Sequence, residues 1–222
     1  MLKGIDVSHH NSEINFDDYD FVIVRAGFGK YDTQIDRKFK YHMDELIKLK
    51  KHIGVYWFSY AKDIKEAIQE ANVCFNIIKG YLENIDIGIW YDFEYDSESF
   101  NSSINYNNTL RSQIIFAFIN RMKELTNNKK VVGYYANKDY YFNRLNKEIL
   151  KNIPIWFAYW SYETEKDLSG IDNIYIVQYT NTPYDMDFLT ELGYKKMYVI
   201  EDTYDKFNNL IKDLESLLNK YK

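Results

Sequence analysis

The stretch Ile87-Gly-Ile-Trp-Tyr-Asp92-Phe-Glu94 sets the expected fold, because it is an apolar run of strand length that ends in two acidic residues. A nearly uninterrupted apolar run is typical of a strand that is covered on both faces, as in parallel sheets. In barrels of parallel strands the chemistry lies at the carboxyl ends of the strands. We therefore expect a strand over residues 86–91, with Asp92 and Glu94 at its functional end.

Further runs of the same kind recur along the chain, with turn signals between them, and predict the other strands. They are residues 4–7, 20–25, 53–60, 130–135, 155–159, 173–179 and 184–189. Helical patterns lie between several of these runs: Asp63-x-x-Glu66 is a capping box that opens one helix, and residues 36–50 and 106–125 predict two more. Alternating strands and helices indicate an α/β protein with a mainly parallel sheet.

The connections predict an irregular barrel. Residues 8–19 have poor helical periodicity, and only Thr-Asn-Thr-Pro-Tyr-Asp separates Tyr179 from Met186. A parallel crossover needs roughly 10–12 residues or more, so the last strands must be joined by loops or hairpins. We expect a TIM-like β/α barrel with few helices in its second half, in one catalytic domain over residues 1–222. Residues 203–221 are amphipathic and predict a C-terminal helix that packs on the barrel or, alternatively, binds a partner.

Composition excludes several classes of function. The 222 residues carry 28 Lys and Arg against 33 Asp and Glu, and a net charge of −5 argues against a nucleic-acid binder. The single cysteine excludes an internal disulfide and a cysteine-rich zinc site. No apolar run approaches the ~18–20 residues of a membrane span, so no membrane insertion is expected. No charged-then-apolar leader is present, and we expect a protein that is made without a Sec-type signal and stays in the cytoplasm until it is released.

Acidic residues mark more than one strand end. Within an extended segment Asp92 and Glu94 share a face, about 7 Å apart along the strand, and two such carboxylates raise each other's pKa. Asp6 ends the first strand, and Asp185 and Asp187 lie in the last strand-like segment. First and last strands are neighbours in a closed barrel, so these acids are expected to converge on one mouth.

A cluster of carboxylates suits either a divalent metal or glycoside hydrolysis. A metal site would also use His9 and His10, but consecutive histidines on a loop rarely both face one ion. We therefore expect no metal, and interpret both histidines as polar residues of the surface or the groove.

Aromatic residues are abundant, with 22 Tyr, 14 Phe and four Trp. They serve either as core packing or as rings that stack on sugars. The candidates for stacking, all near predicted strand ends, are Tyr56, Phe58, Tyr134, Tyr135, Tyr159 and Trp160. Arg25 and Gln178 are candidates for hydrogen bonds to the substrate or the carboxylates. Arg25 is expected to lie away from Glu94, because a guanidinium would lower the pKa of that acid.

Six segments, in order, carry a resemblance to one family. They are Gly4-Ile-Asp-Val-Ser-His-His-Asn11 with Ile14-Asn-Phe16, Phe21-Val-Ile-Val-Arg-Ala-Gly-Phe-Gly29, Gly54-Val-Tyr-Trp-Phe-Ser59, Trp90-Tyr-Asp-Phe-Glu94, Pro154-Ile-Trp-Phe-Ala-Tyr159, and Val177-Gln-Tyr-Thr180 followed by Asp185. Together they resemble the lysozymes (N-acetylmuramidases) of glycoside hydrolase family 25. The likeness spans about residues 3–189 and leaves residues 190–222 as an additional tail of strand and helix.

The resemblance implies a peptidoglycan hydrolase, such as a phage endolysin or a bacterial autolysin, that cleaves the β-1,4 bond between N-acetylmuramic acid and N-acetylglucosamine without metal or cofactor. Glu94 matches the family's general acid and Asp92 its partner carboxylate. Asp6 and Asp185 match the acids of the first and last strands. The alternatives are a barrel glycosidase acting on chitin-like chains, and an inactive barrel that only binds peptidoglycan; the intact acids argue against the second.

Three positions depart from the family pattern: Trp57 replaces a histidine, Val177 a tryptophan and Asp187 an asparagine. None of these departures removes one of the four acids, but we expect Trp57 and Asp187 to alter the grip on the substrate.

The mechanism stays open at this point. Asp92 either orients the substrate's acetamido group for attack on the anomeric carbon or stabilises the developing cation, whereas Asp6 or Asp185 could activate water. The adjacency of Asp92 and Glu94 favours the first route.

Overall fold

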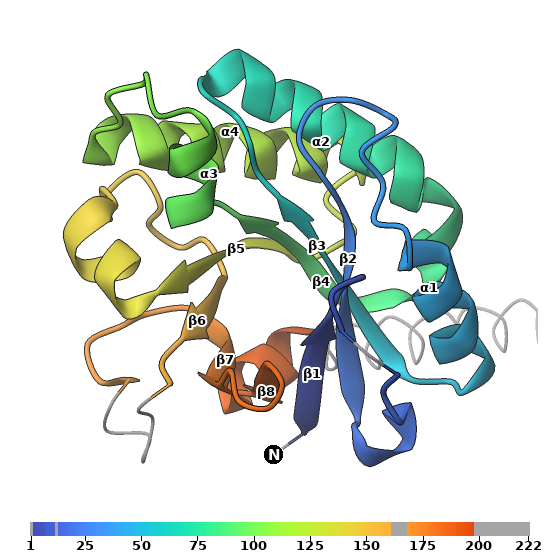
Figure 1. The fold of residues 1–222 in the computed structure, drawn as a ribbon. Helices are drawn as coiled ribbons and strands as arrows, with labels where there is room; N and C mark the ends of the chain where they lie inside the picture. The colour runs from blue at the N-terminus through green and yellow to red at the C-terminus, as the bar shows by residue number, and fades with distance from the viewer. Residues whose placement is uncertain (1, 12, 161–167, 198–222) are drawn as a thin grey trace, which may run out of the picture.

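Eight short strands close into one barrel in the order in which they occur along the chain (Figure 1). This computed structural model describes residues 2–11, 13–160 and 168–197. The strands are β1 (Lys3–Val7), β2 (Phe21–Phe28), β3 (His52–Phe58), β4 (Ile85–Asp92), β5 (Val132–Asn137), β6 (Ile155–Ala158), β7 (Ile174–Thr180) and β8 (Met186–Leu189). Each predicted strand is thus confirmed, with bounds shifted by a few residues.

Neighbouring strands run parallel from β1 through β7, and β8 is antiparallel to both β7 and β1. The short link before Met186 is the reason, because it permits only a hairpin. The expected irregular end of the barrel is therefore confirmed. Closure places Gly4 opposite Asp187 and Gln178 opposite Asp187, so the first and last strands contribute to one wall.

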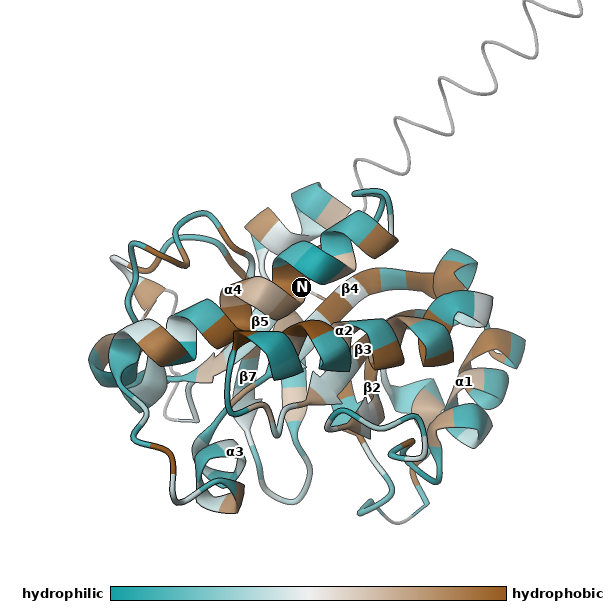
Figure 2. Cartoon of the chain, turned by 90° about the horizontal axis from the view of Figure 1, so that it is seen from above, coloured by the Kyte–Doolittle hydropathy of each residue, from teal (hydrophilic) through white to brown (hydrophobic). Residues whose placement is uncertain are grey.

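The helices cover only part of the barrel. They are α1 (Phe39–Lys48), α2 (Ile64–Ile78), α3 (Tyr95–Phe100) and α4 (Asn108–Leu125), with 3-10 turns η1 (Phe16–Asp18) and η2 (Lys79–Asn84) and a π-helical turn η3 (Tyr140–Arg144). Figure 1 shows α1, α2 and α4 outside the strands of the first half, and loops dominate around β6 to β8. Figure 2 shows hydrophilic and hydrophobic residues alternating along α2 and α4, as expected for helices with one face on the barrel.

Side-chain caps open the two longest helices, and the sequence predicts the first of them. The Asp63 carboxylate accepts a 2.9 Å hydrogen bond from the Glu66 backbone at the start of α2. At the start of α4 the Asn107 side chain accepts one from Leu110, which places this start two residues after the predicted one. The predicted helix over residues 36–50 is the shorter α1.

Side chains of the strands separate into two layers. Residues that face the barrel interior include Phe21, Ile23, Tyr56, Trp90 and Trp156, and their neighbours in sequence pack outward under the helices. In β4 this alternation is reset at Gly88, whose φ of +91° accompanies a shift of register against β3. After the shift, Trp90 lies inside the barrel and Asp92 follows on the same face.

The predicted C-terminal helix over residues 203–221 lies outside the described residues; within them, residues 191–197 are helical. Among the described helices, none combines the length and apolar character that crossing a bilayer requires.

Candidate active site

A cavity of about 570 Å³ opens at the carboxyl ends of the parallel strands. Four acids that are far apart in sequence line it together: Asp6, Asp92, Glu94 and Asp185. The expected convergence of these side chains on one mouth is thus seen. Asp96 is a fifth acid in the wall of this cavity. The volume of the cavity lies within the ~300–1,000 Å³ of typical small-molecule sites.

The end of β4 is fixed by backbone hydrogen bonds. The Ser59 amide donates to the Asp92 carbonyl oxygen at 2.8 Å, which ties the ends of β3 and β4 together. Glu94 follows in extended conformation, immediately before α3, and its amide donates to the Ser97 hydroxyl at 3.1 Å. Strand and helix therefore both constrain the segment between the two acids.

Burial in this acidic wall keeps Glu94 protonated at higher pH than an ordinary glutamate. Desolvation is the largest cause and raises its pKa to about 7, with the negative charges of Asp96 and Asp185 adding to the effect. A carboxylic acid that holds its proton near neutral pH is suited to general acid catalysis.

Asp92 is buried more deeply than Glu94. Desolvation and the charge of Glu94 raise its pKa, and Arg25 opposes them. Its Oδ1 atom is buried and has no hydrogen-bond partner among the described residues. A buried acceptor without a partner is costly in a folded protein, so this oxygen is well suited to a donor that arrives with a ligand.

Gln178 links β7 to β1 inside the pocket. Its Nε2 donates to Asp6 Oδ2 at 2.8 Å, and its Oε1 accepts from Tyr135 Oη at 3.2 Å and from Trp160 Nε1 at 3.0 Å. These bonds orient the amide and hold one oxygen of Asp6. Desolvation is nevertheless the largest influence on Asp6, and its pKa is raised well above the usual range.

Asp187 lies beside Asp6, below the pocket wall. Its side chain is 0% exposed, and Oδ1 accepts a 2.7 Å hydrogen bond from Trp156 Nε1. Burial raises the pKa of Asp187, and the charge of Asp187 in turn raises the pKa of Asp6. Two neighbouring buried carboxyls favour a state in which they do not both ionise.

Arg25 is held by a rim of polar groups. Its Nε donates to Asp36 Oδ2 at 2.7 Å, and the same carboxylate binds the His9 ring and backbone. His9 and His10 line the pocket. Arg25 lowers the pKa of Asp92, and it is not among the groups that shift the pKa of Glu94.

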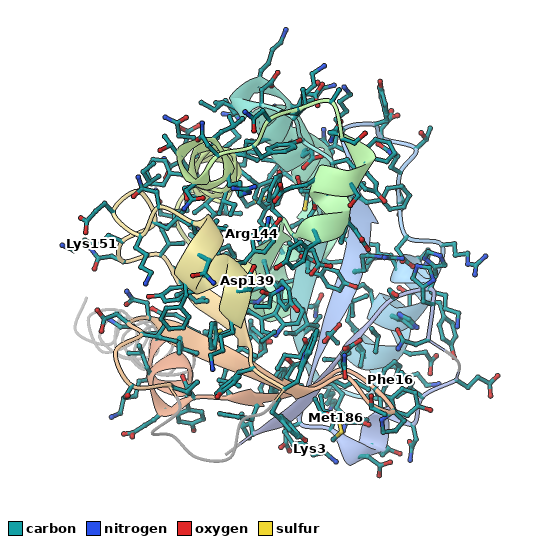
Figure 3. The ribbon with its side chains drawn as sticks, turned by 60° about the vertical axis from the view of Figure 1, so that its left-hand side comes forward. Lys3, Phe16, Asp139, Arg144, Lys151 and Met186 are labelled. Atoms are coloured by element: carbon teal, nitrogen blue, oxygen red, sulfur yellow. The ribbon has the colours of Figure 1, made fainter. Side chains whose placement is uncertain are left out.

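The turn η3 anchors the helix that follows Glu94. Glu98 of α3 forms a two-pronged ion pair with Arg111 of α4, at 2.7 and 2.8 Å, and accepts from the Tyr140 hydroxyl. Tyr95 binds Asp139, which also pairs with Arg144 at 2.8 Å; both of these labelled side chains lie on one segment in Figure 3. The start of α3 is therefore clamped from two sides.

The family model of glycosyl hydrolases family 25 matches residues 5–188. The chain belongs to this family. Among curated protein sequences, none matches the chain.

Solved structures of similar fold include an autolysin, the catalytic domain of a phage endolysin and a bacterial glycosyl hydrolase. The modular autolysin LytC from Streptococcus pneumoniae, solved with a synthetic peptidoglycan ligand, is 27% identical with a TM-score of 0.67. The match covers 84% of this chain and 46% of LytC, so the chain spans less than half of that protein. The catalytic domain of endolysin ply40, from bacteriophage P40 of Listeria monocytogenes, is 20% identical, with coverage of 89% and 97% and a TM-score of 0.67. A family 25 glycosyl hydrolase from Bacillus anthracis is 16% identical, with coverage of 88% and 93% and a TM-score of 0.69.

The wall of this cavity contains most of the residues that the sequence predicts to bind substrate, but not all of them. Besides the four acids, the predicted residues in its wall are Arg25, Tyr56, Phe58, Tyr135, Trp160 and Gln178. Tyr134 is corrected: it is 2% exposed and packs in the layer outside the barrel, because adjacent residues of a strand point to opposite faces. Tyr159 and Asp187 are not in the wall either; Tyr159 accepts a hydrogen bond from Lys138.

Sequence reasoning missed other parts of the wall, including Asp96, Tyr60 and Trp156. Side chains two residues apart on a strand share a face, so a barrel-facing Ala158 would have placed Trp156 inside the barrel as well. Asp96 belongs to α3, a helix that the sequence did not predict. Trp57, one of the departures from the family pattern, is buried outside the barrel, where its Nε1 donates to the Gly29 carbonyl. Within the described part of the chain, no three His, Cys, Asp or Glu side chains form a group that could hold a metal ion.

Proposed function

We propose that this family 25 hydrolase is a muramidase that cleaves the β-1,4 bond between N-acetylmuramic acid and N-acetylglucosamine in bacterial peptidoglycan. The observation that carries the proposal is Glu94, a carboxyl with its pKa raised to about 7, in a cavity with four other acids at the carboxyl ends of the parallel strands. The fold shared with LytC, an autolysin solved with a peptidoglycan ligand, supports the substrate class. We infer that residues 1–222 act as one catalytic domain at the cell wall.

Glu94 is the proton donor in this proposal. Cleavage requires a proton on the oxygen of the leaving sugar as the bond to the anomeric carbon breaks. A neutral Glu94 supplies that proton, and the raised pKa keeps the donor form populated up to about pH 7.

Asp92 is the positioning carboxylate. Its unpartnered Oδ1 can accept the N–H of the substrate's 2-acetamido group, and the carbonyl oxygen of that group then attacks the anomeric carbon. Water opens the resulting cyclic intermediate, with Glu94 as the base that takes the proton back. Two displacements at the same carbon leave its configuration unchanged.

The bond assignment and the acid are tested in one experiment. Purified cell walls are incubated with wild type, with Glu94→Gln and with the exposed control Glu83→Gln, and the new reducing sugar is identified. We expect a muramic acid end from wild type and control, and a fall of about 10²–10⁴-fold for Glu94→Gln. A glucosamine end, or full activity of Glu94→Gln, would refute the proposal.

The route through the acetamido group has its own readout. NMR of the first-formed product gives the configuration at its anomeric carbon, and we expect retention. Net inversion would eliminate substrate assistance and would assign a water-activating role to Asp6 or Asp185.

A further inference from the structure

An aromatic strip leads out of the pocket on the side of β2 and β3. Phe28, Phe58 and Tyr60 line the cavity, and Tyr60 meets the other two rings edge to face, with centroids at 5.8 and 5.4 Å. Beyond Tyr60 the strip continues onto Phe100, whose ring stacks on Tyr60 at 4.2 Å and 28°. The strip, defined by these four residues, thus runs from the catalytic acids to the surface.

The outer end of the strip is open to solvent. Phe100 is 67% exposed, the largest exposed fraction of any large hydrophobic side chain among the described residues. Single exposed apolar residues are common on protein surfaces. Phe100 differs from such residues because Tyr60 backs one face of its ring and the strip continues into the active site.

The protein holds this stacked pair in place. The Tyr60 amide donates to Glu70 Oε1 at 2.8 Å, and the Tyr60 carbonyl accepts from Asn101 Nδ2 at 2.8 Å. Asn101 directly follows Phe100 at the end of α3. Both rings of the pair therefore sit on backbone that is fixed by one contact network, and little ordering is needed when a ligand binds.

Ring faces of this kind suit sugars. The face of an aromatic ring carries partial negative charge, whereas the C–H groups on one side of a pyranose are apolar and slightly positive. The net charge of −5 gives no long-range attraction to a polysaccharide that carries carboxylates, so stacking and hydrogen bonds are well suited to supply the affinity.

We propose that Phe100, backed by Tyr60, is a distal sugar-binding platform that stacks on the glycan strand beyond the two residues joined by the cleaved bond. This inference rests on the proposed function, because it places the same glycan in the same cleft. It makes the enzyme prefer long glycan strands over short ones.

The test compares two peptide-free substrates of the same repeating disaccharide, a tetrasaccharide and an octasaccharide. We expect Phe100→Ala to reduce the ratio of kcat/KM for the octasaccharide to that for the tetrasaccharide by roughly 3- to 10-fold, and Phe100→Trp to preserve it. The control is Phe116→Ala, an exposed phenylalanine of α4 remote from the pocket. An unchanged ratio in Phe100→Ala, or an equal loss on both substrates, would overturn the platform.

Binding separates this inference from the proposed function. Calorimetric titration of the octasaccharide into Glu94→Gln and into Glu94→Gln/Phe100→Ala requires no turnover. Weaker binding by the double variant supports the platform even if wild type cleaves neither oligosaccharide. Equal binding by the two variants, or dependence on Phe100 only with peptide-bearing glycans, would refute it as a sugar site.

Discussion

Asp96 tunes the acid Glu94 through charge alone. It is exposed, lines the pocket, and is the second-largest cause of the raised pKa of Glu94 after desolvation. Replacing it with asparagine removes one negative charge and keeps the shape of the side chain. The proton on Glu94 is then less strongly held, so its pKa moves downward.

We therefore expect Asp96→Asn to shift the alkaline limb of the pH profile of kcat/KM to lower pH. The sign follows from the proposed role of Glu94 as proton donor: the donor form is lost as pH rises through its pKa, and a lower pKa brings that loss earlier. The shift should be less than about one unit, since water screens an exposed charge. The profile is measured on a soluble oligosaccharide, with Asp172→Asn as control. If the alkaline limbs of wild type and Asp96→Asn coincide, Asp96 does not set the pKa of Glu94.

Single residues also show how far sequence patterns reach. Tyr134 and Tyr135 were equally good candidates as adjacent tyrosines at a strand end, yet only Tyr135 faces the pocket. The phase of alternation decides between them, and it is set by strand pairing that one segment alone does not reveal. Asp92 and Glu94 were found because they end an apolar strand, a signal that Asp96 lacks.

At the scale of elements, a buried network joins β3, β4 and α2 behind the pocket. Glu70 of α2 is 0% exposed, and its Oε2 accepts from Tyr91 Oη at 2.6 Å. Tyr91 Oη also lies 2.7 Å from Ser59 Oγ. Since Tyr91 precedes Asp92 and Ser59 precedes Tyr60, the network positions both a catalytic candidate and the aromatic strip.

Glu70 should make stability depend on pH. Desolvation raises its pKa from 4.5 to about 7 in the folded protein, against the hydrogen bonds from Tyr91, Tyr60 and Ser59. The folded state therefore binds the proton more tightly than the unfolded state. The contribution of this proton to the free energy of unfolding is complete below pH 4.5. It declines as pH rises to about 7, by roughly 3 kcal/mol over the whole range.

Glu70→Gln replaces the titrating carboxyl with a neutral amide and keeps the shape of the side chain. We expect the unfolding free energy of the variant, relative to wild type, to rise between pH 4.5 and about 7. Urea unfolding of both proteins at several pH values measures this difference. The other buried carboxyls are present in both proteins, so their effects on the pH dependence cancel when the two free energies are subtracted. Glu83→Gln is the matched control, and a difference that is the same at every pH would show that Glu70 is not the titrating group.

Elements were predicted as well as their local signals allowed. The strands and the longer helices α2 and α4 have runs, caps and periods that can be read within one segment. The six-residue α3 opens with a capping box of Glu94 and Ser97, but neither α3 nor the turn η3 is long enough to show a helical period. Both are held by partners elsewhere, such as the pair between Glu98 and Arg111, and such contacts cannot be read within one segment.

For the whole molecule, closure of the barrel makes the site. The hydrogen bond from Gln178 to Asp6 joins residues 172 positions apart, and β8 fits between β7 and β1 only as an antiparallel strand. The order of strands predicted this neighbourhood, whereas the hydrogen bonds within it depend on register. The acids of β1 and of the segment before β8 meet because the first and last strands are neighbours in the closed barrel.

The charge of the whole molecule leads to a prediction about salt. The chain has a net charge of −5, and the proposed substrate carries carboxylates on its peptides, so long-range forces between them are repulsive. Raising ionic strength from ~0.01 to ~0.15 M shortens the Debye length from about 30 to about 8 Å and screens this repulsion. We expect the rate on whole cell walls to stay level or rise over that range. A steep fall would mean that a basic surface drives binding, and would remove the reason for assigning affinity to aromatic rings and hydrogen bonds.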